Sequence, residues 1–158
     1  MASSRRSYLT SIGAGVATIS AGCSSRVSTQ KYRVAILTVR NRSNATRTIT
    51  VQLRHHGQSA NNPAYQKSLK VKPFHVPKDS TEAKKPSTQG EITVTSGFPT
   101  KLADYIVAAK TNAMNEWQTV TLSKILQTGC AGISVVASQS GNVSIYSASL
   151  HENRCSNN

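Results

Sequence analysis

The chain has 158 residues, and its 19 Lys and Arg against 6 Asp and Glu give a formal net charge of +13. That length suits one domain with a real core and argues against several domains. Apart from the first 25 residues, no apolar run approaches the roughly 20 residues of a membrane-spanning helix, and the few aromatic residues do not alternate with basic ones as a nucleic-acid stacking platform requires.

The N-terminal 25 residues carry the most specific motif, Ser4-Arg5-Arg6-Ser7-Tyr8-Leu9. A stretch rich in Gly and Ala follows, too short to span a bilayer as a stable helix, and it ends at Ala21-Gly22-Cys23. The segment resembles a twin-arginine export signal joined to a lipoprotein cleavage box, although Ser20 stands where that box usually has leucine. The resemblance implies that export is directed by Arg5, Arg6, Tyr8 and Leu9 and that Cys23 is lipidated.

Cleavage before Cys23 divides the chain into a signal peptide (1–22), a lipid-anchored linker (23–30) and one domain (31–158). The mature chain would keep 136 residues, with 17 basic and 6 acidic side chains. Two acyl chains on one cysteine would hold the protein firmly on the outer face of the cell membrane, whereas one chain binds only marginally. The basic excess is either a solvated surface or a site for anionic envelope polymer or lipid headgroups.

Short alternating segments separated by polar turns begin at residue 32, a pattern typical of an all-β sandwich or barrel. Residues 32–39 are apolar on both faces, with Val34 and Ile36 sharing one face and Ala35, Leu37 and Val39 the other. Residues 46–54 alternate cleanly and predict a half-exposed strand. The tight turn at 41–45 predicts that these two segments form a hairpin.

The middle of the chain predicts further strands separated by loops. A loop at 55–64 precedes a strand, and the three prolines of 72–90 predict a long exposed loop. Ser123 is a candidate cap for one helical turn. The expected elements are strands at 65–71, 91–95, 102–110 and 117–122 and the helical turn at 123–127.

The last two strands, 131–138 and 143–150, flank the turn Gln139-Ser140-Gly141-Asn142, in which Gly or Asn can take positive φ. Centring the turn between Ser140 and Gly141 places Cys130 opposite His151. In an exported chain the two remaining cysteines, Cys130 and Cys155, predict a disulfide. That bridge requires residues 151–154 to curl back over the end of the sheet.

Seven or eight strands with almost no helix predict a two-sheet antiparallel sandwich. Asp104-Tyr105-Ile106-Val107 resembles the sixth strand of immunoglobulin-like and fibronectin-like domains. In those domains a tyrosine two residues before a core position ties down a corner, and the resemblance implies this role for Tyr105. The lone tryptophan, Trp117, is expected between the sheets, with the floor of a sugar or peptide groove as the alternative.

The residues that could carry chemistry form no recognisable constellation. Adjacent His55 and His56 would point to opposite faces of a strand, and Cys130 has no nearby His or Met as a blue-copper site requires. The sequence lacks Gly-x-Ser-x-Gly, His-Glu-x-x-His and a Gly-rich phosphate loop. Glu91 and Asp104 are the conceivable glycosidase pair. We therefore expect no metal, no cofactor and no enzymatic activity.

Three glycosylation sequons fall in predicted turns, where an exported chain would expose them, and their acceptors are Asn41, Asn44 and Asn142. The whole chain resembles the small twin-arginine lipoproteins of halophilic archaea, in Arg5-Arg6-x-Tyr-Leu, in Ala-Gly-Cys and in a β domain closing with Cys, a Gly-turn hairpin and Cys. Its positive charge departs from the acidic composition of exported halophile proteins. The resemblance implies a membrane-held surface domain with a non-catalytic binding or structural role.

Two other functions remain open. A surface receptor for a small ligand or sugar requires a concave aromatic pocket. An enzyme of unfamiliar type requires two or more of a small set of side chains to meet within hydrogen-bond reach, and that set is His55, His56, His75, Glu91 and Asp104.

Overall fold

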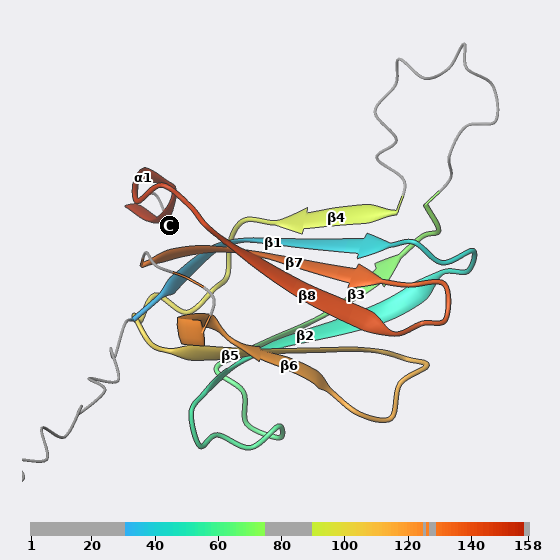
Figure 1. Cartoon of the computed structure of the whole chain (residues 1–158), viewed down its shortest axis with the longest axis horizontal. Coiled ribbons are helices and arrows are strands. Elements are labelled where there is room, and N and C mark those ends of the chain that lie inside the picture. The colour runs from blue at the N-terminus through green and yellow to red at the C-terminus, as the bar shows by residue number, and fades with distance from the viewer. Residues whose placement is uncertain (1–30, 75–89, 125, 127–128, 157–158) are drawn as a thin grey trace, which may run out of the picture.

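Eight strands form two four-stranded sheets that pack face to face (Figure 1), which confirms the predicted two-sheet sandwich. The computed structural model describes residues 31–74, 90–124, 126 and 129–156. Two short helical turns, η1 (Leu122–Lys124) and α1 (Asn153–Ser156), complete this part of the chain. The strands are β1 (Arg33–Asn41), β2 (Arg47–His55), β3 (Tyr65–Val71), β4 (Glu91–Val94), β5 (Tyr105–Thr111), β6 (Gln118–Thr121), β7 (Cys130–Ala137) and β8 (Val143–Ser149).

One sheet has the order β4-β1-β7-β8 and the other β3-β2-β5-β6. The β1–β7 pair is parallel, and the other strand pairs are antiparallel. Consecutive strands β1 and β2 therefore lie in different sheets, so the predicted hairpin between them is wrong.

The side chain of Asn41 explains this crossing. It is fully buried, and its Nδ2 donates to the carbonyl oxygens of Ala45 at 2.8 Å and Val71 at 3.0 Å. Its Oδ1 accepts from the backbone N–H of Ser43 at 3.0 Å. These bonds fold the turn onto the end of β3, so that the chain enters the second sheet instead of pairing β2 with β1.

A β-bulge in β1 changes the predicted faces of that strand. The ladder with β7 skips Ala35 between Val34 and Ile36. Val34 consequently faces the main core together with Leu37, while Ala35 packs against Cys130 on the other side. The expected pairing of Val34 with Ile36 on one face is wrong, because one extra residue shifts the alternation.

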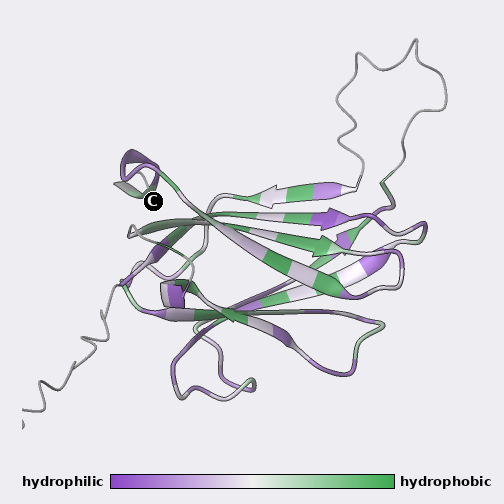
Figure 2. Cartoon of the chain, viewed as in Figure 1, coloured by the Kyte–Doolittle hydropathy of each residue, from purple (hydrophilic) through white to green (hydrophobic). Residues whose placement is uncertain are grey.

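The hydrophobic core lies between the two sheets. Ile49, Val51 and Leu53 of β2 lie beside Val107 and Ala109 of the neighbouring strand β5. Together they face the inner residues of the other sheet, and each of these five is at most 1% exposed. Figure 2 shows the corresponding alternation of apolar and polar residues along the strands. Burial of each Val, Leu or Ile contributes roughly 1.5–3 kcal/mol. The apolar face predicted for β2 is confirmed, but the expected exposure of its other face is wrong at Gln52, which is buried.

The last hairpin forms as predicted, with its register shifted by one residue. Gly141 has a φ of 88°, and its N–H donates to the carbonyl of Ser138 at 3.0 Å. The loop between the paired ends of β7 and β8 is residues 138–142. Because this loop has an odd number of residues, Cys130 lies opposite Leu150 rather than opposite His151. The N–H of Leu150 donates to the carbonyl of Cys130.

The predicted signal peptide, the linker and most of the predicted loop 72–90 lie outside the described residues. Within the described part, no helix is long and apolar enough to cross a membrane. β1 begins at the end of the sandwich that also holds α1 (Figure 1).

Candidate functional site

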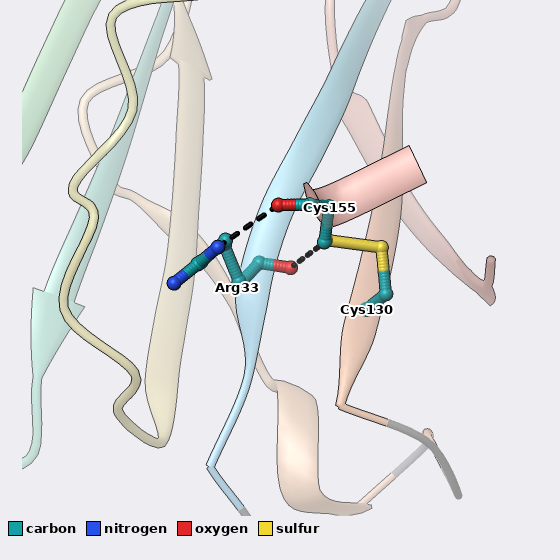
Figure 3. Close-up of a disulfide and its surroundings, with 3 residues drawn as sticks. All are labelled: Arg33, Cys130 and Cys155. Carbon is teal, nitrogen blue, oxygen red and sulfur yellow. Dashed lines mark hydrogen bonds between the residues drawn. A yellow bond between two sulfur atoms is a disulfide. The ribbon is translucent and has the colours of Figure 1, made fainter. Parts of the chain in front are cut away.

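The predicted disulfide between Cys130 and Cys155 is present, with Cα atoms 5.9 Å apart (Figure 3). The chain after β8 curls back through α1, as the bridge requires. Nη1 of Arg33 donates to the carbonyl of Cys155 at 2.9 Å, and Sγ of Cys155 lies 3.5 Å from the carbonyl oxygen of Arg33. The second contact is not a hydrogen bond, because a disulfide sulfur carries no proton. The C-terminal turn is therefore held to both β7 and β1.

An open cleft of about 310 Å³ lies beside this disulfide. Leu102 lines it and is 45% exposed, one of three large hydrophobic residues that are exposed in the described part. Glu152 also lines the cleft, together with two basic residues, Lys31 and Arg33. We call this surface, with the cations of the Leu102 corner, η1 and α1, the basic end: Lys31, Arg33, Lys101, Leu102, Lys124 and Arg154.

Leu102 belongs to a corner that is anchored on both sides. The hydroxyl of Tyr105 donates to the carbonyl of Lys101 at 2.6 Å, which confirms the expected corner tyrosine. On the other side, Tyr32 and Ala103 exchange two backbone hydrogen bonds. Burial raises the pKa of the Tyr32 and Tyr105 hydroxyls above the usual value, so both remain neutral donors at physiological pH.

The sequence prediction missed this corner, because it placed Leu102 in a strand. The strand begins at Tyr105 instead. Tyr105 itself was the available signal. A corner tyrosine bonds to the backbone a few residues upstream of its strand, so the residues just before Tyr105 had to form a loop.

Two of the candidate catalytic side chains approach each other. His56 Nε2 lies 3.5 Å from Oδ2 of Asp104, and the imidazole is 64% exposed. Ser123 donates its hydroxyl to the same oxygen at 2.7 Å and its backbone N–H to Oδ1 at 3.2 Å. Asp104 thus caps η1. The Ser123 hydroxyl therefore faces a carboxylate. A serine nucleophile is usually activated by an imidazole base instead.

The other candidates lie apart from this pair. His55 packs against the Tyr105 ring with centroids 5.1 Å apart, and Glu91 forms an ion pair with Arg40. His75 is outside the described residues. Among the described residues, no three His, Cys, Asp or Glu side chains come together to hold a metal ion.

Trp117 lies on an outer face of the sandwich, so its expected place between the sheets is wrong. The register pairs Ala109 with Gln118, which puts Trp117 across from Lys110 on the side away from the core. Nζ of Lys110 lies 4.9 Å from the ring centroid and Cζ of Arg54 lies 5.7 Å from it. The two cations stabilise the exposed sheet face by packing on the ring.

The aromatic residues in the described part of the chain do not converge on one pocket. Tyr32 and Tyr105 are fully buried, and Tyr65 packs against a neighbouring phenylalanine. Tyr146 is 59% exposed and lines a shallow groove of about 250 Å³ on the outer face of the β1–β7–β8 sheet. Trp117 lies on the opposite sheet. This arrangement does not favour a receptor with a concave aromatic site.

The three sequons differ in exposure. Asn41 is fully buried and its Nδ2 is engaged in hydrogen bonds, so it is not an exposed acceptor in the folded protein, and that prediction is wrong. Asn44 and Asn142 are exposed in turns. The residues predicted for export and lipidation lie outside the described residues: Arg5, Arg6, Tyr8, Leu9 and Cys23.

No family model and no curated protein matches this chain. Similar solved structures include "Trapped Toxin" (11% identity, 74% of this chain and 23% of that chain, TM-score 0.32). Another is the human-specific toxin intermedilysin (11% identity, 74% of this chain and 23% of that chain, TM-score 0.33). A disulfide-locked intermedilysin mutant with human CD59 is also similar (12% identity, 74% of this chain and 24% of that chain, TM-score 0.30). The chain spans less than a quarter of the length of these proteins, and no functional argument follows from likeness at this level.

Proposed function

We propose that this chain is an exported, lipid-anchored β-sandwich with a non-catalytic binding or structural role at the outer face of the cell membrane. The observation that carries the proposal is the disulfide between Cys130 and Cys155. Structural disulfides form and persist in oxidising compartments outside the cytoplasm. The twin-arginine motif and Cys23 in the sequence are the matching export and lipidation signals.

Two of the four described carboxylates are engaged in structural contacts, which favours a non-catalytic role. Asp104 is used to cap η1, and Glu91 is bound to Arg40. General acid–base chemistry needs such groups placed within reach of a substrate in a cleft. The cleft at the basic end is lined by two cations, one carboxylate, Leu102 and the disulfide. The excess of positive charge there suits contact with an anionic surface.

The proposal is tested by intact mass and fractionation of the chain expressed in its native host. We expect a membrane-bound product that begins at Cys23 and carries a diacylglycerol adduct. The matched control is Cys23→Ser, which keeps the paired arginines and removes the lipid acceptor. It should carry no adduct, and high salt should release it from the membrane fraction. Wild-type protein that is found in the cytoplasm with residues 1–22 intact would refute the proposal.

A further inference from the structure

We propose that the basic end docks directly onto an anionic lipid bilayer, with Leu102 in the headgroup region and Lys31 and Lys101 against lipid phosphates. The inference rests on the proposed function, which brings the domain to a membrane. It adds a second contact besides the lipid on Cys23, and it fixes which end of the sandwich faces the bilayer.

Charge is the first reason. The basic end carries five cations, and the described carboxylates near it are Asp104 and Glu152. Asp104 is already engaged by Ser123 and His56. Lys31 and Lys101 expose their side chains. A Lys or Arg held at an anionic membrane surface strengthens binding about fivefold.

The exposed leucine is the second reason. Leu102 lies between Lys101, whose carbonyl binds Tyr105, and Ala103, which is bonded to Tyr32. The backbone on both sides is therefore already ordered, so insertion would cost little conformational entropy. Burying the exposed half of one leucine side chain strengthens binding about fivefold.

The path of the chain is the third reason, because it distinguishes this end from the opposite one. The eight residues from Cys23 to Lys31 reach at most about 28 Å from the bilayer. The opposite end, which carries Arg42 and Lys72, is about 30 Å further away along the nine residues of β1. That separation exceeds the Debye length of about 10 Å, so the cations of the opposite end cannot contribute when the basic end is docked.

The test uses the full chain as Cys23→Ser, which cannot be lipidated, with vesicles of phosphatidylcholine with or without phosphatidylglycerol. Co-sedimentation measures the partition coefficient. Lys31→Gln combined with Lys101→Gln should weaken binding to anionic vesicles about 25-fold, and Leu102→Ser about fivefold. The matched control, Arg42→Gln combined with Lys72→Gln, removes the same charge at the opposite end and should change binding less than about twofold.

Residues 1–30 are the same in every variant, so binding by that segment is an equal additive background, which is subtracted before the ratios are taken. The affected side chains are exposed, and equal urea midpoints would verify that each variant is folded. Equal losses from both charge pairs would overturn the proposal, as would binding that ignores phosphatidylglycerol. Retention on heparin that tracks the charges, with no effect of Leu102→Ser on vesicle binding, would assign the surface to a soluble polyanion instead. A dimer that Leu102→Ser dissociates would assign it to a second copy.

The lipidation experiment in the host and this vesicle experiment can fail independently. An unlipidated, secreted wild-type chain whose Cys23→Ser form still binds anionic vesicles through Leu102 would remove the anchor and keep the docking surface. A lipidated chain that shows no such binding would keep the anchor and overturn the docking surface.

Discussion

Asn41 lies where the chain leaves one sheet for the other, and replacing it tests whether its side chain holds that crossing. Asn41→Ala removes the donor to the buried carbonyl of Val71 and the acceptor for Ser43. It also removes the bond to the Ala45 carbonyl. At about 1 kcal/mol for each hydrogen bond, and more where a buried partner is left unpaired, the free energy of unfolding should fall by about 3–4 kcal/mol.

Urea unfolding measures this loss, with the fluorescence of Trp117, the single tryptophan, as the signal. The matched control is Asn44→Ala, an exposed position in the same turn, which should change stability by less than about 0.5 kcal/mol. Asn41→Asp should be at least as damaging as Asn41→Ala at neutral pH, because a carboxylate cannot donate to the Val71 carbonyl. If Asn41→Ala costs less than about 1 kcal/mol, the amide does not hold the crossing and our account of it is wrong.

Three further predictions concern the disulfide, the corner and the outer sheet face. Replacing Cys130 and Cys155 by Ala should lower the free energy of unfolding by about 3.5 kcal/mol, the entropy of a 25-residue loop, and a urea titration showing a loss below about 1 kcal/mol would contradict this. Tyr105→Phe should cost about 1 kcal/mol through loss of the bond to Lys101. Burial raises the folded-state pKa of Tyr105 above the unfolded value of about 10, so stability should fall as pH rises above about 10, and Tyr105→Phe should weaken that dependence in urea titrations at alkaline pH. Trp117→Ala should cost only about 1 kcal/mol, since the ring packs on exposed cations, and a loss of 3 kcal/mol or more in thermal unfolding would point to a core role.

The parts of the fold that could be predicted are those set by neighbouring residues. The alternation of β2 follows from the period of a strand, and it placed Ile49, Val51 and Leu53 in the core correctly. The disulfide followed from the two cysteines that remain after Cys23. The corner role of Tyr105 followed from the resemblance of Asp104-Tyr105-Ile106-Val107 to the sixth strand of immunoglobulin-like and fibronectin-like domains.

Features that depend on contacts between distant segments could not be predicted. Val34, Ala35 and Ile36 are all apolar, so the bulge leaves no trace in the local pattern, and its position is set by pairing with β7. The hydrogen bond from Asn41 to Val71 joins segments 30 residues apart. The amphipathic ring of Trp117 suits both the core and the surface. Arg54 of β2, whose guanidinium lies over the ring, is far from Trp117 in the sequence.

The candidate site shows the same division. Lys31 and Lys101 are ordinary surface residues when each is considered alone. The bridge between Tyr32 and Ala103 brings the two segments that carry them side by side. Leu102 has an apolar side chain that a strand would accept. Its exposure follows from the corner, which is closed by hydrogen bonds to the residues on either side of it.

The parallel pairing of β1 with β7 has a consequence for folding kinetics. Arg33 pairs with Cys130, so the centre of one sheet joins segments 97 residues apart. Closing that loop costs about 2–3 kcal/mol more in chain entropy than closing the β7–β8 hairpin. Proteins dominated by such distant pairings fold in milliseconds to seconds. During synthesis, β1 and its partner β4 must therefore wait for nearly the whole chain, and they need protection from association until β7 emerges.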